Sequence, residues 1–241
     1  MSLKKKAKKA IWKLGLDLVS FSPTKHPLAR RRHILAHRQI GLVLDVGANT
    51  GQYAQQLRND LEFTGRIVSF EPLLDAHTAL EQASKNDAKW QTFNFALGDE
   101  NKSLDINRAN NSQSSSLLEM MPAHVESAPQ SAYVGKETVQ VRTLDSVFSE
   151  IKSTGEQILL KIDAQGYERN VLEGASASLE HIDLLQIELS LVSLYKGEDL
   201  IEDMIQYLRT LGYDLIALED SGFSDPVSGH MMQVDGIFSR K

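Results

Sequence analysis

The chain has 241 residues, 41% of them apolar, which is enough to bury the core of one large α/β domain. Because it contains no cysteine, disulfides, thiolate metal sites, Cys-ligated iron–sulfur clusters and cysteine nucleophiles are excluded. The net charge of −6 divides unevenly: residues 1–38 contain eleven Lys or Arg and one acid, whereas residues 39–241 contain fifteen basic and thirty-one acidic side chains. We therefore expect a basic N-terminal extension over residues 1–38 and one acidic domain over residues 39–241.

The extension is predicted to be helical and amphipathic. Its apolar residues at helical spacing are Leu3, Ala7, Ile11, Leu14 and Leu18, and most lysines fall on other faces. No apolar run in the sequence approaches the ~20 residues of a membrane-spanning helix. Lys13 and Asp17 interrupt the apolar stretch that a secretory signal would need, so we expect a cytoplasmic protein.

Two roles for the extension stay open. The helix could dock on the domain or on a partner subunit and keep a solvated basic face. Alternatively, it could attach to an anionic membrane surface, at the inner side of the membrane, with Trp12 and Phe21 as interfacial anchors. Nucleic acid is not an expected partner, because the acidic body offers no continuing basic track.

From residue 40 onward, strands and helices alternate. The apolar periodicity predicts, in chain order, a strand at 40–46, a helix at 52–59, a strand at 65–72, a helix at 76–85, and strands at 90–97 and 102–107. The periodicity then breaks over residues 108–136, which are rich in Ser, Asn, Ala and Pro. A loop of that length inside a domain is typical of a functional lid, and we predict a lid over the site.

Regular elements return after this loop. We predict a strand at 137–142, a helix through 151 with Thr143 as its N-cap, a strand at 157–163, a helix at 167–174, a strand at 182–189, a helix at 200–211, and strands at 213–218 and 234–238. The alternation predicts an α/β, Rossmann-like fold: a doubly wound, mostly parallel seven-stranded sheet. The last two strands leave no room for a helix between them, so they should form an antiparallel pair at one edge.

The turn at residues 47–51 indicates a nucleotide-like ligand. Gly47 would let the chain turn sharply after a buried strand, and Gly51 would let a ligand approach without meeting a Cβ atom. A dinucleotide site has a third glycine. Asp45, just before the turn, would repel a pyrophosphate but suits the amino and sulfonium groups of S-adenosylmethionine. Glu71, after the next strand, would accept hydrogen bonds from ribose hydroxyls. A nicotinamide-dependent oxidoreductase stays as the alternative.

Seven segments, in order along the chain, resemble those of the FkbM-type S-adenosylmethionine-dependent methyltransferases. They lie at residues 45–53, 69–72, 94–98, 141–145, 160–168, 171–175 and 187–189. The resemblance runs from about residue 42 to the C-terminus and leaves the basic extension unexplained. It implies a class I methyltransferase fold and methylation of a hydroxyl on a sugar, a glycan or a small natural product.

The resemblance also implies the residues of the cofactor site. Asp45, Gly47, Asn49 and Gly51 would hold the methionine part of the cofactor, Glu71 with the adjoining Pro72 the ribose, and Ala96 and Leu97 would border the adenine, while Ser115 lies in a serine-containing loop expected nearby. Gln165 departs from the family pattern, in which a glutamate is common at this position. That departure weakens the argument for a charged metal ligand there.

Methyl transfer to an alcohol requires alignment of the acceptor and removal of its proton. Lys161 and Asp163 lie on one side of a buried strand end, and Glu188 lies near the end of the next buried strand. These three are the predicted catalytic residues; Asp163 and Glu188 together would suit Mg²⁺ or a similar cation, and one alone could act as general base. Alternatively, Lys161 and Asp163 form a structural ion pair and Glu188 caps a loop. His124 and His181 are alternative bases, or surface residues.

The sequence indicates the acceptor atom but not the acceptor molecule. The sequence has no Asn-Pro-Pro-Tyr or Asp-Pro-Pro-Tyr segment, which many exocyclic-amine methyltransferases use, and no cysteine for attack on a pyrimidine ring. Oxygen is therefore the favoured acceptor atom. A cofactor-binding module without catalysis, recruited by its basic N-terminus, is the non-enzymatic alternative.

Overall fold

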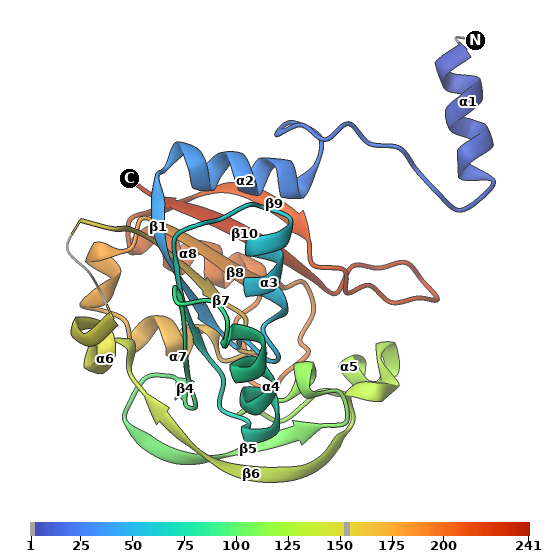
Figure 1. The fold of residues 1–241 in the computed structure, drawn as a ribbon. Helices are drawn as coiled ribbons and strands as arrows, with labels where there is room; N and C mark the ends of the chain where they lie inside the picture. Colours follow the sequence, from blue (N-terminus) through green and yellow to red (C-terminus); the bar gives the residue numbers. More distant parts are fainter. Residues whose placement is uncertain (1–2, 152–154) are drawn as a thin grey trace.

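The computed structural model describes residues 3–151 and 155–241, and its centre is a seven-stranded sheet (Figure 1). The strands are β1 (Ile40–Val46), β2 (Arg66–Phe70), β3 (Trp90–Phe93), β7 (Gln157–Ile162), β8 (Leu184–Ser190), β9 (Tyr213–Asp220) and β10 (Gln233–Arg240). Their order is β3-β2-β1-β7-β8-β10-β9. Neighbours from β3 to β8 are parallel, and β10 is antiparallel to both β8 and β9. The predicted α/β fold, with its antiparallel C-terminal pair at one edge, is confirmed.

Helices cover both faces of this sheet. The helices of the described residues are α1 (Leu3–Trp12), α2 (Pro27–His37), α3 (Gln52–Asn59), α4 (Leu74–Ser84), α5 (Pro122–Ser127), α6 (Leu144–Ile151), α7 (Glu168–Glu173) and α8 (Ile201–Thr210). Of these, α2, α3, α4, α6, α7 and α8 contribute to the core on the two faces of the sheet. Successive residues of a strand point to opposite faces. Leu42 and Leu44 of β1 therefore pack with α6, α7 and α8, whereas Val43 packs with α2, α3 and α4. Burial on both faces explains why β1 is apolar at nearly every position.

One predicted strand is wrong, because residues 90–97 divide between two sheets. β3 ends at Phe93, and β4 (Ala96–Leu97) joins a second sheet of order β4-β6-β5 with β5 (Lys102–Ala109) and β6 (Tyr133–Arg142). Between β3 and β4, the Asn94 side chain donates hydrogen bonds to the carbonyl oxygens of Glu71 and Pro72, both at 3.0 Å. These bonds fix the chain where it leaves the main sheet.

The segment predicted as a loop at 108–136 is shorter in the structure. β5 runs to Ala109 and β6 begins at Tyr133, so only residues 110–132 lie outside strands. This part contains α5 and two short 3-10 turns, η1 (Ser112–Ser114) and η2 (Pro129–Ser131). Several of its side chains line the cavity described below.

The N-terminal extension contains two helices instead of one. α1 ends at Trp12, followed by Gly15 with a φ of 72°, so the predicted stripe does not continue as a helix to Leu18; the side chains of Leu3 and Ala7 lie outside the described part. α1 stands apart from the sheet (Figure 1). Among the described residues, none of the helices has the length and apolar character needed to cross a bilayer.

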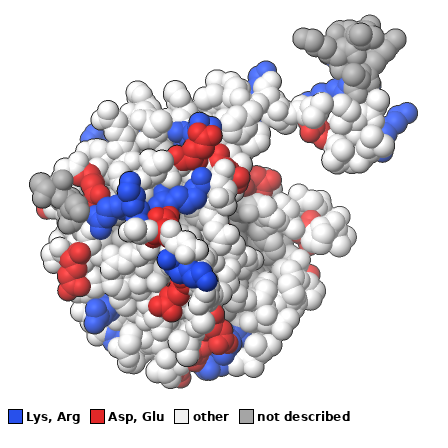
Figure 2. Space-filling model, in the orientation of Figure 1, with Lys and Arg blue, Asp and Glu red and all other residues white. Residues whose placement is uncertain are grey.

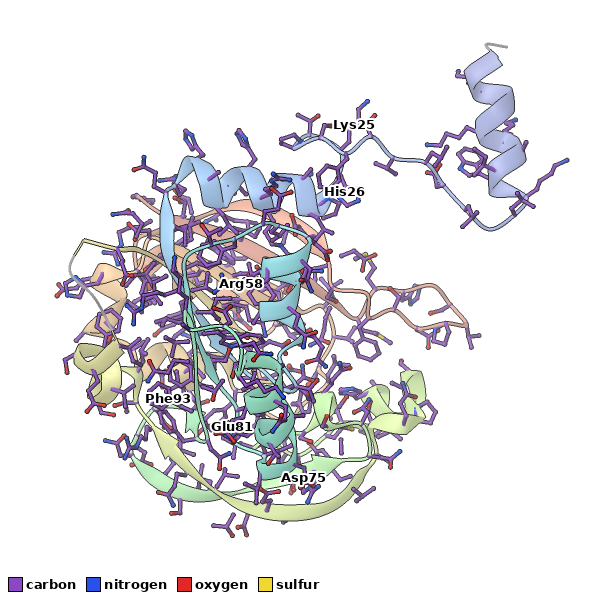
Figure 3. The ribbon with its side chains drawn as sticks, in the orientation of Figure 1. Lys25, His26, Arg58, Asp75, Glu81 and Phe93 are labelled. Carbon is purple, nitrogen blue, oxygen red and sulfur yellow. The ribbon has the colours of Figure 1, made fainter. Side chains whose placement is uncertain are left out.

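The second helix, α2, packs on the domain. Its Arg31 is buried and bonds to Glu219 Oε2 of β9 at 2.7 Å and to Gln56 Oε1 of α3 at 3.1 Å. The apolar pattern missed this helix because a charged side chain occupies its buried face. Pro27 at its first turn is the signal that could have located it. Figure 3 shows Lys25 and His26 where the extension reaches this helix.

Candidate active site

A cavity of about 810 Å³ opens at the carboxyl ends of β1, β2, β7 and β8. This is the edge at which doubly wound sheets bind their ligands, and the size suits a cofactor together with a small acceptor. Ten of the predicted site residues line it: Gly47, Asn49, Glu71, Pro72, Ala96, Leu97, Ser115, Lys161, Asp163 and Glu188. Asp45 and Gly51 are not among the described residues that do so.

Three residues of the turn after β1 have a positive φ: Gly47, Asn49 and Gly51. Gly47 has a φ of 72°, and a Cβ atom there would lie 1.9 Å from the carbonyl oxygen of Asp163, so only glycine lets β1 and β7 end this close together. Asn49 has a φ of 47°, which asparagine tolerates better than most residues. Its backbone N–H donates to Glu71 Oε2 at 2.8 Å. The turn therefore depends on the end of β2 as well as on β7.

Gly51 has a packing role that the sequence did not predict. Its φ is 89°, and a Cβ atom there would lie 2.8 Å from the ring of Trp90 and 3.0 Å from Leu80. Glycine is thus needed for packing against the core, beneath the turn. The expectation that it also gives a ligand room to approach stays a prediction.

Glu71 lies in the cavity wall at the end of β2 with both carboxylate oxygens oriented by the backbone. Oε2 accepts the N–H of Asn49 at 2.8 Å, and Oε1 accepts the N–H of Leu73 at 2.9 Å. Burial raises the pKa of Glu71 to about 7, against the opposing effect of these two hydrogen bonds. Each oxygen retains acceptor capacity beyond its one backbone bond. The carboxylate can therefore accept two further hydrogen bonds, as the hydroxyls of a ribose would require.

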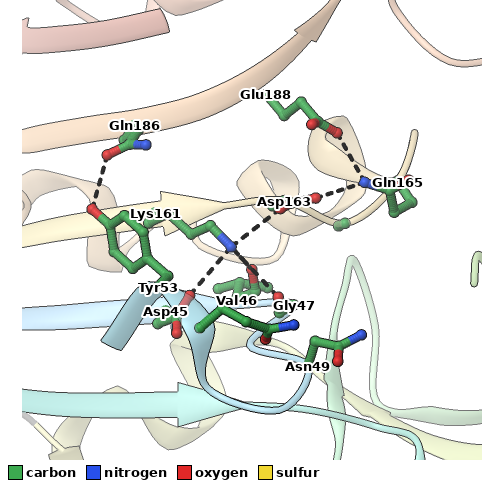
Figure 4. A network of polar contacts seen from close by, with 12 residues as sticks. Asp45, Val46, Gly47, Asn49, Tyr53, Lys161, Asp163, Gln165, Gln186 and Glu188 are labelled. Atoms are coloured by element: carbon green, nitrogen blue, oxygen red, sulfur yellow. Dashed lines mark hydrogen bonds and ion pairs between the residues drawn. The ribbon is translucent and has the colours of Figure 1, made fainter. Parts of the chain in front are cut away.

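Lys161 of β7 connects the polar groups below the cavity (Figure 4). Its ammonium nitrogen lies 3.3 Å from Asp45 Oδ1 and 3.4 Å from Asp163 Oδ2, and also 3.4 Å from the carbonyl oxygens of Val46 and Gly47. Burial alone would lower the pKa of Lys161, but Asp163 and Asp45 more than offset it and raise the pKa above its usual value. Lys161 is therefore held as a cation and is not suited to act as a base. Its charge instead holds Asp45, Asp163 and the end of β1 together.

Asp45 is fully buried beneath the turn. It pairs with Lys161, and its Oδ2 accepts a hydrogen bond from Ser69 Oγ at 3.3 Å. Burial raises its pKa, while Lys161 acts in the opposite direction. Its carboxylate neutralises Lys161, and the contact with the cofactor predicted for Asp45 stays a prediction.

The amide of Gln165 lies between the two carboxylates predicted to hold a metal. Its Nε2 donates to Asp163 Oδ1 at 2.7 Å and to Glu188 Oε2 at 2.9 Å (Figure 4). Tyr195 holds this amide in place by donating from its hydroxyl to Gln165 Oε1 at 2.7 Å. An amide N–H occupies the place where a cation would bridge the carboxylates, and the described residues contain no group of three His, Asp or Glu suited to a metal. The Asp163 and Glu188 pair does not fit the predicted metal site.

Glu188 is the carboxylate best suited to accept a proton. Burial raises its pKa well above the usual value, and the charges of Asp163 and Glu168 raise it further. Besides Gln165, the side chain of Gln233 donates to Glu188 Oε2 at 2.8 Å. The Lys161–Asp163 ion pair of the alternative interpretation is present, but Glu188 bonds to two glutamine side chains instead of capping a loop.

The two histidines considered as bases differ in location. His124 of α5 is only 2% exposed, lies in the cavity wall, and packs against Tyr195 and Phe223 with ring centroids 5.2 Å away in each case. Burial lowers its pKa to about 4, so it is neutral at pH 7. His181 is partly exposed, stacks on Phe148 and is not among the described residues lining the cavity. The expectation of a surface residue is wrong for His124.

Further polar residues complete the cavity wall beside Glu188. The Tyr53 hydroxyl donates to Gln186 Oε1 at 2.8 Å, and Asp235 of β10 pairs in register with Glu188. Burial raises the pKa of Asp235 to about 6. Sequence reasoning missed these residues, although the two-residue period of β8 places Gln186 on the same side as Glu188.

The strand order and the position of the cavity define the Rossmann-like fold of class I methyltransferases. Residues 45–215 match the family model described as "Methyltransferase FkbM domain", so the chain belongs to the FkbM methyltransferase family. No curated protein matches the sequence.

Solved structures are similar in fold. The FkbM methyltransferase from Methylobacillus flagellatus KT has a TM-score of 0.51 and 16% sequence identity. The aligned region covers 82% of this chain and 43% of that protein's chain. TehB from Haemophilus influenzae has a TM-score of 0.48 and 10% identity, covering 89% and 61%. The magnesium protoporphyrin IX methyltransferase from Synechocystis PCC 6803 has a TM-score of 0.46 and 8% identity, covering 89% and 78%. The chain thus spans less than half the length of the FkbM structure.

The buried cation gives a first prediction. Lys161→Met should lower the free energy of unfolding by about 3–5 kcal/mol, because it leaves the Asp45 carboxylate buried without its partner. Asp45→Asn in the same chain should restore most of that loss. Urea unfolding of both variants measures the effect, and a loss below about 1 kcal/mol in Lys161→Met would contradict it.

Proposed function

We propose that this chain is an S-adenosylmethionine-dependent O-methyltransferase. Membership of a methyltransferase family supports the reaction type. The observation that carries the cofactor assignment is Glu71, a buried carboxylate in the cavity wall whose two oxygens are fixed by backbone N–H groups. The cofactor supplies an electrophilic methyl group on its sulfonium, so the protein has to align the acceptor and take its proton.

The cofactor residues follow the cavity wall from β1 to β4. Gly47 and Asn49 would hold the methionine end, Glu71 and Pro72 the ribose, and Ala96 and Leu97 the adenine. Ser115 would support the cofactor site indirectly. Its Oγ accepts a hydrogen bond from the backbone N–H of Ala109 at 3.0 Å, which fixes the start of the loop at residues 110–132. Asp45 and Gly51 support the turn from below.

The remaining part of the cavity suits an acceptor rich in hydroxyl groups. Amides both donate hydrogen bonds to hydroxyls and accept them, and carboxylates accept them. The wall contains three of each: Gln165, Gln186, Gln233, Asp163, Glu188 and Asp235. We therefore propose a sugar, a glycan or a small hydroxylated natural product as acceptor. A nicotinamide oxidoreductase is disfavoured by the family and by the missing third glycine of the turn.

Glu188 is proposed as the general base that takes the proton of the acceptor hydroxyl. Asp163 is less suited, because both of its oxygens already have partners: Oδ2 pairs with Lys161 at 3.4 Å, and Oδ1 accepts a hydrogen bond from Gln165 at 2.7 Å. Lys161 cannot accept a proton, and His124 is a weaker base because burial lowers its pKa to about 4. A carboxylate with a raised pKa is closer to the optimum for proton transfer near neutral pH.

The cofactor assignment is tested by calorimetry with S-adenosylhomocysteine. Glu71→Gln should weaken binding about 10–100-fold, because a neutral amide replaces a charged acceptor of two hydroxyls. Wild-type affinity should fall as the pH decreases through about 7, since protonation removes that acceptor, and the variant should lack this dependence. Exposed Glu100→Gln is the matched control. Unchanged affinity in Glu71→Gln would contradict the assignment.

The base assignment is tested by transfer of a radiolabelled methyl group to an acceptor selected from a panel of hydroxylated sugars and natural products. Glu188→Gln should lower kcat by about 10²–10⁴-fold without weakening S-adenosylhomocysteine binding. Wild-type kcat should rise with pH through the raised pKa of Glu188, because the base must be ionised. Glu202→Gln, exposed on α8, is the control. A variant Glu188→Gln with wild-type kcat and pH profile would remove Glu188 from this role.

A further inference from the structure

The segment that joins α1 to α2 exposes an unusual concentration of large apolar side chains. Between 51% and 75% of the surface of each is exposed, and they are Trp12, Leu14, Leu16, Leu18, Val19 and Phe21. The other exposed large hydrophobic residues lie between Leu74 and Met231 in the domain. A cluster of this kind marks a surface that is covered by a partner in use.

The cluster is held in a defined local structure. The N–H of Gly15 donates to the carbonyl of Trp12 at 3.0 Å, and that of Leu16 to the carbonyl of Ile11 at 3.3 Å, which ends α1 in a tight turn. The indole N–H of Trp12 donates to Asp17 Oδ1 at 3.0 Å. Trp12 and Leu14 are therefore displayed by a folded turn, and the other four apolar side chains follow it in a stretch without helix or strand.

The charge around this cluster is positive. Lys5, Lys9, Lys13 and Lys25 are exposed near it. The acid within it, Asp17, is paired with Lys8 at 3.1 Å, so it does not offset the exposed lysines. Figure 2 shows blue lysine side chains beside uncharged surface on this part of the chain. Residues 1–38 together carry +10, in contrast to −16 on residues 39–241.

We infer that residues 8–25 bind an anionic membrane surface. Lysines attract the negatively charged headgroups, and the leucines with Trp12 and Phe21 insert at the boundary between headgroups and acyl chains. A nucleic acid would match the lysines but not six exposed apolar side chains. A second copy of the chain is the competing occupant of this surface, and the light-scattering measurement below distinguishes it from a membrane.

A second apolar point lies near the cavity. The loop between β9 and β10 exposes Val227 at 95% and Met231 at 39%, and its residues 221–224 line the cavity. Figure 1 shows this loop and the extension on the same side of the domain. The extension itself reaches the cavity wall through Arg31 of α2. Contact of both this loop and residues 8–25 with one bilayer would place residues 221–224 of the cavity wall near the lipid.

Sedimentation of the full chain with vesicles tests this inference. Binding to vesicles of phosphatidylcholine with about 30% phosphatidylglycerol should exceed binding to pure phosphatidylcholine at least about 10-fold, and it should weaken with added salt. Equal binding to both vesicles, or none to either, would overturn the inference. The experiment does not depend on methyl transfer, so its outcome is separate from that of the proposed function.

Tryptophan fluorescence locates the contact. The chain has two tryptophans, and Trp90 is only 7% exposed, so a blue shift of the emission on anionic vesicles reports Trp12. Leu14→Ser with Leu16→Ser should abolish the shift and lower vesicle binding about 10-fold or more. Leu74→Ser, at a leucine of α4 that is 60% exposed, should leave both unchanged. A dimer in light scattering that the two leucine changes dissociate would overturn the inference in favour of a second copy.

Discussion

The buried ammonium of Lys161 is the constraint on which the rest of the site depends. It lies where β1 and β7 end side by side, within 3.4 Å of two carboxylates and two backbone carbonyl oxygens. An unpaired charge at this depth would be strongly unfavourable, so Asp45 has to be present to neutralise it. The close approach of the two strand ends in turn requires glycine at position 47.

This arrangement gives carboxylates at one sheet edge different properties. Asp163 is ion-paired with Lys161, whereas Glu188 accepts hydrogen bonds from two glutamine amides and its pKa is raised by burial. Glu71, farther along the edge, is fixed by two backbone N–H groups. Burial and neighbouring charges give similar carboxyl groups different pKa values. One carboxylate of the cavity can therefore bind a cofactor while another accepts a proton.

The sequence predicted the elements with strong apolar periodicity, and β1 and α3 begin and end where expected. It could not show that the apolar run 90–97 divides at Asn94, because the carbonyl oxygens that accept the Asn94 hydrogen bonds belong to Glu71 and Pro72, which follow β2. The glycine spacing predicted that Gly51 lies in the turn. It could not predict that Gly51 packs against the core, because the contact is with Trp90, which is distant in sequence. The burial of His124 likewise depends on Tyr195 and Phe223.

The most direct test of the account is a crystal structure of the full chain with S-adenosylhomocysteine. It should show both ribose hydroxyls within about 3 Å of the Glu71 carboxylate oxygens, with the homocysteine end beside Gly47 and Asn49. Its sulfur should face the side of the cavity that holds Glu188. A ligand bound without contact to Glu71, or outside this cavity, would contradict the account.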